Sequence, residues 1–213
     1  MKSKTVSKKK AQEIQQILAT TYPEAHCELN FSTPFELLIA TVLSAQATDK
    51  RVNQVTAHLF NKYPTPQAFL QLTQEEMETE IKEIGLFRNK AKNILALSQI
   101  LVDKFHGQVP DNMDDLIALP GVGRKTANVV LSNAFGIPAF AVDTHVLRVS
   151  NRLGLANADN PDQVEQQLMS IIPKANWINA HHWLIWHGRR ICAARKPKCE
   201  ICPLQPHCRH HGK

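Results

Sequence analysis

The chain has 213 residues, of which 43% are hydrophobic, so it can bury one large core or two modest ones. Its net charge of +6 and pI of about 9.1 favour an anionic partner, nucleic acid first, although a surplus that serves only solubility looks the same. No apolar run approaches the roughly 18 residues of a membrane span, which argues against a membrane protein.

The N-terminal stretch MKSKTVSKKK holds five lysines, and no apolar signal core follows it. We expect a solvated arm here, which could also touch DNA, in a cytoplasmic protein. The thiols of such a protein are reduced, so its five cysteines are better candidates for ligands or core residues than for disulfides.

Helix signals then follow one another along the chain. Residues 32–46 offer Thr33 as an N-cap, Pro34 at the first helical position and Glu36 for a capping box. Residues 73–85 repeat this pattern with Thr73 and Glu76, and Gly85 is the predicted stop. Further helices are expected at 88–105, at 160–172 behind Asn160 and Pro161, and at 177–190. With no convincing strand alternation, the sequence predicts an all-α protein of about ten helices.

The stretch LPGVGRKTANVVL, residues 119–131, carries the first functional signal. It lacks the glycine spacing of a phosphate-binding P-loop, and it lacks the third glycine of a dinucleotide-binding turn; no strand precedes it. What remains is a helix, a tight turn and a second helix beginning near Arg124. The backbone at Gly121, Val122 and Gly123, with Arg124, is then a site for a DNA phosphate, independent of base sequence. A structural turn without a ligand is the alternative.

A weaker echo of this stretch lies upstream. IGLFRNKAKNIL, residues 84–95, repeats the order of its Gly, Arg and Ala/Asn residues. We interpret it as a second helix–turn–helix corner with a structural role and no catalytic one.

Two residues near the hairpin are candidates for catalysis. Lys125 would lie in the first turn of the second hairpin helix, whose positive end disfavours the ammonium form, so it is a candidate amine nucleophile. Its alternative role is that of a phosphate-binding lysine. Asp143 stands where an N-cap belongs, in AVDTHVLRVSNRL, and could also stabilise a positively charged sugar. Capping alone is the competing interpretation, and both roles are compatible.

The cysteines Cys192, Cys199, Cys202 and Cys208 follow the pattern C-x6-C-x2-C-x5-C. Four thiolates this close can hold one zinc ion or one [4Fe–4S] cluster. A single C-x-x-C knuckle with two wider loops favours the cluster, and spacing alone leaves zinc open. The surrounding segment 189–198 has five basic residues and no acid, which predicts phosphate contacts by Arg195, Lys196 and Lys198.

In combination these motifs resemble the endonuclease III family of DNA glycosylases, from about Glu28 to Cys208. The resemblance implies an all-α fold with two helical domains flanking a DNA-binding cleft, a helix-hairpin-helix motif and a C-terminal iron–sulfur cluster loop. A six-helix domain would span 27–137, and residues 1–26 plus 138–213 would form the cluster domain. The four cysteines would hold a [4Fe–4S] cluster.

The resemblance also implies roles for single residues. Lys125 would be the Schiff-base nucleophile and Asp143 the essential carboxylate. Gln46, in LSAQATD, would fill the gap left by an extruded nucleotide, and Leu86, in IGLFRNK, would wedge into the opposite strand. Ser44, Asp49 and His145 fall on positions that face the pocket in the family.

The implied function is base-excision repair of double-stranded DNA with damaged pyrimidines or abasic sites, by a monomer in the bacterial cytoplasm, associated with the nucleoid. An adenine-mismatch glycosylase of the same superfamily is the nearest alternative, but it needs no nucleophilic lysine and usually has an additional C-terminal domain. A non-catalytic helix-hairpin-helix DNA-binding protein and an electron-transfer iron–sulfur protein are the alternatives from other classes.

Overall fold

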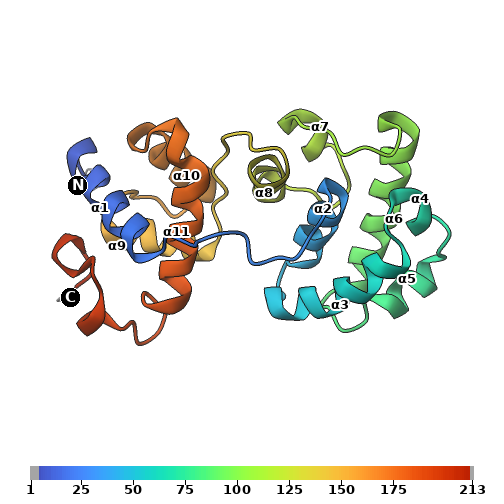
Figure 1. The fold of residues 1–213 in the computed structure, drawn as a ribbon, viewed down its shortest axis with the longest axis horizontal. Helices are drawn as coiled ribbons and strands as arrows, with labels where there is room; N and C mark the ends of the chain where they lie inside the picture. Colours follow the sequence, from blue (N-terminus) through green and yellow to red (C-terminus); the bar gives the residue numbers. More distant parts are fainter. Residues whose placement is uncertain (1–4, 212–213) are drawn as a thin grey trace. The chain divides into compact units, whose positions relative to one another are not determined.

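The computed structural model describes residues 5–211, and all regular secondary structure in that range is helical, with no β-strand. This confirms the all-α prediction. Contacts group the chain into two compact units, Cys27–Ile137 and the combination of Met1–His26 with Pro138–Lys213, whose helices are labelled in Figure 1. Within the described range, no helix combines the length and the apolar character needed to cross a membrane.

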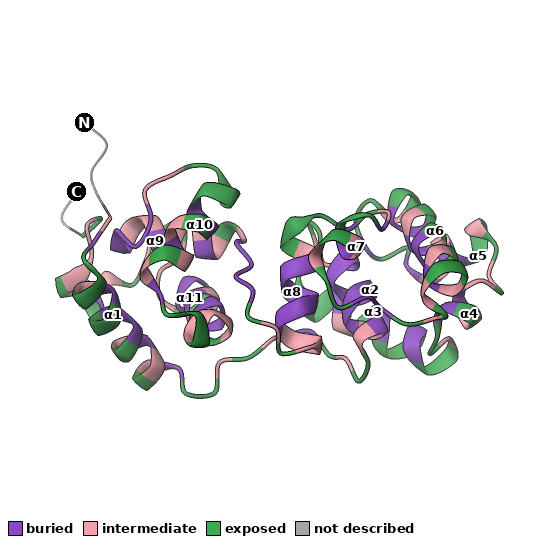
Figure 2. Cartoon of the chain, turned by 90° about the horizontal axis from the view of Figure 1, so that it is seen from above, coloured by how far each residue is buried: buried purple, intermediate pink, exposed green. Residues whose placement is uncertain are grey.

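The Cys27–Ile137 unit is built around one buried helix. Every residue of α2 (Pro34–Leu43) is buried except Pro34 and Glu36, and Figure 2 shows the buried colour along its length. Both α8 and α6 pack on it. The unit has seven helices where six were expected, and the shortest of them is a single turn capped by Thr65. The other six are α3 (Asp49–Lys62), α4 (Pro66–Phe69), α5 (Gln74–Glu80), α6 (Phe87–Phe105), α7 (Met113–Ile117) and α8 (Arg124–Ala134).

Cap chemistry explains where these helices begin. The side chain of Thr33 accepts the Glu36 N–H, as predicted, but the Glu36 carboxylate accepts from the Ser32 N–H, one residue before the cap. That bond replaces the predicted capping box. The box predicted for Thr73 and Glu76 is complete in α5. There the helix ends at Glu80 and not at Gly85, because the chain turns early to bury Ile81 and Ile84.

The second unit packs four α-helices around an apolar core that includes Ile14, Leu18, Val146, Val149 and Leu168. These helices are α1 (Lys8–Thr21), α9 (Thr144–Leu153), α10 (Pro161–Ile171) and α11 (Trp177–Arg190), with short 3-10 turns at Lys174–Asn176, Cys199–Ile201 and Gln205–His207. The caps predicted at Asp143 and Asn160 are both present.

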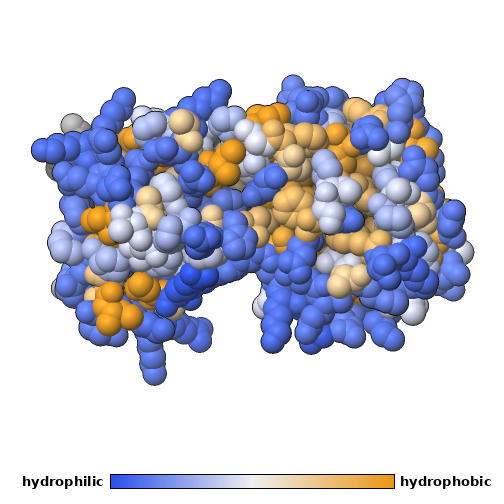
Figure 3. Space-filling view, in the orientation of Figure 1, coloured by the Kyte–Doolittle hydropathy of each residue, from blue (hydrophilic) through white to orange (hydrophobic). Residues whose placement is uncertain are grey.

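The predicted lysine-rich arm is shorter than expected. Its residues 1–4 lie outside the described range, and Lys8, Lys9 and Lys10 already form the first turn of α1 behind the Ser7 cap. A helix starts here because Ala11, Ile14 and Leu18 bury one face in the core. The face of α1 that remains on the surface is hydrophilic, as Figure 3 shows.

Candidate active site and metal centre

The predicted hairpin is formed by α7, a short turn and α8. Val122 anchors the turn: its side chain is buried and its N–H donates to the Leu119 carbonyl at 3.1 Å. Its amide therefore closes the turn between the two helices. Gly123 is the N-cap of α8, and no side chain caps that helix. A helix end without a side-chain cap presents N–H groups and a positive dipole to an anion, as the sequence predicts.

The two hairpin glycines are glycine for different reasons. Gly121 has φ of +78°, and a Cβ there would lie 3.0 Å from both Cβ and Nδ2 of Asn93. Gly123 has φ of −96°, which any residue adopts, and a Cβ there would meet nothing within 4 Å. The fold itself therefore explains Gly121, whereas Gly123 keeps open the space in front of the helix, where a phosphate would approach.

We expect the corresponding alanine variants to separate these roles. Gly121→Ala should lower the free energy of unfolding by about 1–3 kcal/mol through backbone strain. Gly123→Ala should lower it by only about 0.5–1 kcal/mol, because alanine is a poorer N-cap than glycine, while the added methyl weakens binding of an abasic duplex about tenfold. Denaturant unfolding and DNA titration measure the two effects, and wild-type affinity in Gly123→Ala would contradict a phosphate site at this turn.

Lys125 is the second residue of α8 and is exposed. The helix behind it is fixed by the buried residues Ala127, Val129 and Val130, and it packs on α2. Arg124 is exposed beside it. The hairpin thus presents an amine to solvent from a rigid helix end, directly after the open position at Gly123.

Gln46 and Leu86, the two predicted DNA-probing residues, share a backbone feature that the sequence did not suggest. Both are in the left-handed region, with φ of 57° and 59°. Leu86 is 57% exposed, which is unusual for a large apolar side chain, and Gln46 is exposed as well. A left-handed conformation is costly for a non-glycine residue and is typical of functional sites. Their loops are adjacent, since a Cβ on Gly85 would lie 3.8 Å from the Gln46 carbonyl oxygen.

The predicted pocket residues Ser44 and Asp49 lie on either side of Gln46. Ser44 is the C-cap of α2, and its hydroxyl donates to the Thr41 carbonyl at 2.8 Å. Asp49 is the first residue of α3 and is half-buried. The structure therefore brings both together with Gln46 on one short connection.

Asp143 caps α9 as the sequence predicts. Its Oδ1 accepts the Val146 N–H at 2.7 Å, and the residue is half-buried. Because this bond uses one carboxylate oxygen, the other oxygen remains available for chemistry. Asp143 can therefore cap the helix and act on a substrate at the same time, as the sequence analysis allowed.

His145 follows on the same helix and is held neutral by its surroundings. Burial lowers its pKa most, and the positive charges of Arg148 and Arg189 lower it further, against the opposing effect of Asp143. An Arg148 N–H lies 3.1 Å from Nδ1 of His145.

Arg148 also joins α9 to the cysteine loop. Its Nε and Nη2 donate to the Cys192 carbonyl at 3.1 and 3.0 Å, and Nη2 donates to the Gly188 carbonyl at 2.9 Å. One side chain thus connects the helix that Asp143 caps with the first cysteine of the cluster motif. The sequence analysis missed Arg148, because carbonyl acceptors 40 or more residues away leave no pattern.

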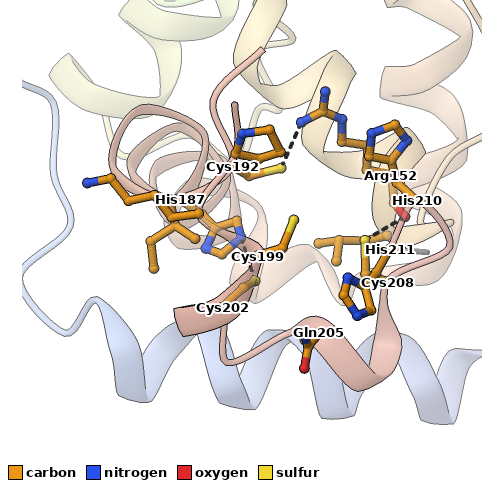
Figure 4. A pocket seen from close by; sticks show the side chains of 13 residues that line it. Arg152, His187, Cys192, Cys199, Cys202, Gln205, Cys208, His210 and His211 are labelled. Carbon is orange, nitrogen blue, oxygen red and sulfur yellow. Dashed lines mark hydrogen bonds between the residues drawn. The ribbon is translucent and has the colours of Figure 1, made fainter. Parts of the chain in front are cut away.

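The four predicted cysteines line a single pocket (Figure 4). All are free thiols and half-buried. In residues 5–211 no three His, Cys, Asp or Glu side chains converge closely enough to hold one metal ion. The sulfurs instead stand around the pocket from four positions in the chain, which suits a cluster that takes one thiolate at each of four iron atoms. The residues present therefore fit a [4Fe–4S] cluster.

Two further side chains contact the sulfurs, and the sequence analysis missed both. Arg152 donates to the Cys192 sulfur at 3.3 Å and to the Ala193 carbonyl at 2.8 Å. Nε2 of His187 lies 3.6 Å from the Cys202 sulfur, and its Nδ1 lies 3.0 Å from the Tyr22 hydroxyl. Burial lowers the pKa of His187 to about 4 and raises that of Tyr22 to about 12, so both are neutral. Hydrogen bonds to cluster sulfurs tune such centres.

The basic residues on the loop between the first two cysteines are all exposed, namely Arg195, Lys196 and Lys198. Lys196 is left-handed, with φ of 51°. The loop is held at its base, because the Lys198 N–H donates to the Ile191 carbonyl at 3.0 Å and Arg152 donates to the Ala194 carbonyl at 3.1 Å. This rigid, basic loop is the arrangement that a phosphate contact needs.

These features agree with a known class of protein. A family model described as the HhH-GPD superfamily base excision DNA repair protein matches residues 39–174, which include the hairpin, Lys125 and Asp143. A second model, the iron–sulfur binding domain of endonuclease III, matches residues 192–208, from the first cysteine of the motif to the last.

Individual relatives narrow the class further. The chain is 50% identical to endonuclease III of Escherichia coli over 208 residues, covering 98% of this chain and 99% of the relative. It is 53% identical to endonuclease III of Bacillus subtilis over 193 residues, covering 90% and 88%. A solved structure of a trapped endonuclease III–DNA covalent intermediate superposes with a TM-score of 0.93 at 52% identity, covering 96% and 97%. The chain belongs to the endonuclease III family, whose members are DNA glycosylases and abasic-site lyases that carry a [4Fe–4S] cluster.

Removing one cysteine of the motif should remove the cluster. We expect Cys202→Ala to lose the visible absorption of the purified protein and to fall from about four iron atoms per chain to nearly none. The loop from Cys192 to Cys208 should then become sensitive to proteolysis, because bound metal contributes to folding. Cys27→Ala, outside the motif, is the matched control and should keep its iron. Full iron content in Cys202→Ala would contradict the assignment.

Proposed function

We propose that this enzyme removes oxidised pyrimidines from double-stranded DNA and then cuts the strand at the resulting abasic site. In this proposal Lys125 is the nucleophile and Asp143 the essential carboxylate. The observation that carries it is the exposed amine of Lys125, in the first turn of an uncapped helix and directly after the open position at Gly123. The trapped covalent intermediate of the similar endonuclease III with DNA supports an attacking side chain.

The reaction proceeds in two stages. The amine nitrogen of Lys125 forms a bond to the anomeric carbon of the sugar as the bond to the damaged base breaks, and the base leaves with a proton. Asp143 stabilises the positive charge that develops on the sugar. The sugar ring then opens: its C1′–O4′ bond breaks, the ring oxygen takes the remaining amine proton and an imine forms, which makes the neighbouring C2′ proton acidic. Loss of that proton breaks the bond to the 3′ oxygen, which cuts the strand 3′ to the lesion.

DNA binding and extrusion use the remaining predicted residues. The hairpin backbone from Gly121 to Arg124 and the basic loop hold the phosphates, largely without reading bases. Gln46 fills the space of the extruded nucleotide, and Leu86 enters the opposite strand. Extrusion costs a few kcal/mol and is easiest for a damaged base, which contributes to selectivity. Ser44, Asp49 and His145 then line the pocket for the extruded base.

Both units contribute to this function. Lys125 comes from residues 27–137 and Asp143 from residues 138–213, and we propose that these units are the two domains of the enzyme. The [4Fe–4S] cluster stabilises the loop that carries Arg195, Lys196 and Lys198. The enzyme acts as a monomer on the chromosome in the bacterial cytoplasm, in line with its bacterial relatives.

A panel of duplexes tests the substrate class. We expect excision and borohydride trapping with thymine glycol and with preformed abasic sites, and neither with adenine opposite 8-oxoguanine. Adenine release without trapping would instead identify the adenine-mismatch glycosylase. Tight binding with no incision of any duplex would identify a non-catalytic DNA-binding protein.

A further inference from the structure

Lys90, on α6, has no role in the proposed mechanism, and its environment is unusual. Within residues 5–211 it is the only buried lysine, with 5% of its surface exposed. Its ammonium donates to two backbone carbonyls, of Leu43 at 3.0 Å and Ala45 at 2.6 Å. Burial lowers its pKa. Burying a charged ammonium costs free energy, so a lysine at this buried position needs a structural or functional explanation.

The two carbonyls lie at the end of α2. Leu43 is the last residue of that helix, and Ala45 follows the C-cap, Ser44. The last carbonyls of a helix have no intrahelical donor and carry the negative end of the dipole. Lys90 supplies the missing donor from a different helix, 47 residues along the chain from Leu43. It therefore fixes the point at which the chain leaves α2.

The next residue after these contacts is Gln46. The Ala45 carbonyl belongs to the peptide plane that leads into Gln46, so rotating this plane would change φ of Gln46. The turn is closed by a bond from the Ala47 N–H to the Ser44 carbonyl at 3.1 Å, and Gln46 is left-handed at 57°. The hydrogen bond from the buried Lys90 ammonium fixes the Ala45–Gln46 peptide plane. It thereby prevents Gln46 from rotating to a negative φ, which is the more favourable range for a non-glycine residue.

The same lysine also contacts the second probing residue. The Lys90 N–H donates to the Leu86 carbonyl at 3.1 Å, which is the first helical bond of α6. Leu86 is the N-cap of that helix and is left-handed, with no side-chain capping bond. Lys90 thus makes hydrogen bonds to both probing segments. Its ammonium donates to the carbonyls just before Gln46, and its backbone N–H donates to the carbonyl of Leu86.

We propose that Lys90 is a positioning residue that locks the Gln46 turn beside Leu86 in the conformation that enters DNA, an inference that rests on the proposed DNA-probing role of Gln46. Lys90 touches neither the substrate nor the reacting atoms. It acts by keeping two costly backbone conformations in place before DNA arrives, so that binding does not have to order them.

A double-mutant cycle with Gln46 tests the inference. Lys90→Met keeps the length of the side chain and removes the donor. We expect Lys90→Met and Gln46→Ala each to slow single-turnover excision of thymine glycol about tenfold, and the double variant to be slowed about tenfold as well, because both changes disable the same turn. 2-Aminopurine next to the lesion reports extrusion, and its fluorescence rise should be reduced in all three variants.

The controls separate positioning from damage to the fold. Lys104→Met removes an exposed lysine near the other end of α6 and should excise at the wild-type rate. A hundredfold loss in the double variant would show independent effects and overturn the inference while leaving the role of Gln46 intact. A wild-type rate in Gln46→Ala would overturn both. If Lys90→Met gives no folded protein, Lys90→Gln, which can still donate to one carbonyl, enters the same cycle, with a smaller loss expected in the single variant and no further loss when it is added to Gln46→Ala.

Discussion

Lys125→Gln is expected to abolish borohydride trapping on both thymine-glycol and abasic DNA and to lower strand cleavage by at least about a thousandfold. Glutamine has nearly the length of lysine and carries no amine, so it can form no imine. The side chain is exposed, so the substitution should leave the free energy of unfolding within about 0.5 kcal/mol of wild type. Trapped adducts on denaturing gels and single-turnover rates measure the effect.

The alternative role of Lys125 predicts a different pattern. If the lysine only binds a phosphate, Lys125→Gln weakens DNA binding, reduces the dependence of log K on log salt by about one, and keeps the covalent adduct. The nucleophile hypothesis predicts the reverse, with binding to abasic DNA largely retained through the hairpin amides at the start of α8. Lys104→Gln is the matched control for a lost surface charge. A trapped adduct in Lys125→Gln would refute the assignment.

The local parts of the fold were predictable from the sequence because their causes are local. Side-chain caps at Thr33, Thr73, Asn160 and Asp143 define helix starts through bonds that reach two or three residues along the chain. The turn at Gly121 needs a positive φ, which glycine signals directly. The cysteine spacing likewise marks a ligand set within one loop, and all four thiols line one pocket.

The supporting residues were not predictable, since their partners are distant. Tyr22 and His187 meet across 165 positions, and Lys90 reaches carbonyls more than 40 positions away. Every residue has a backbone carbonyl, so a hydrogen bond to a carbonyl leaves no recognisable motif in the sequence. Nor does any residue signal mark the left-handed conformations of Gln46 and Leu86, because glutamine and leucine ordinarily avoid that region. Tertiary contacts impose these conformations, which is why their roles came from the resemblance and their geometry from the structure.

Asp143→Asn is expected to separate catalysis from capping, the two roles that one residue combines here. Asparagine caps helices as well as aspartate does, so the bond to the Val146 N–H should persist. Loss of the negative charge near the helix N-terminus costs about 0.3–1 kcal/mol. Excision of thymine glycol should nevertheless fall at least about a hundredfold, because an amide does not stabilise the positive sugar as a carboxylate does.

Two companion variants make this comparison decisive. Asp143→Ala removes the cap as well and should lose about 1 kcal/mol more of stability with no more activity than Asp143→Asn. Asn160→Ala removes the cap of α10 in the same unit and should lose about 1 kcal/mol while excising at the wild-type rate. If Asp143 only capped, Asp143→Asn would be active, and activity across the series would follow stability. Our assignment instead requires activity to depend on the negative charge at position 143. One oxygen of the half-buried carboxylate accepts the Val146 N–H, and the other is left to interact with the substrate.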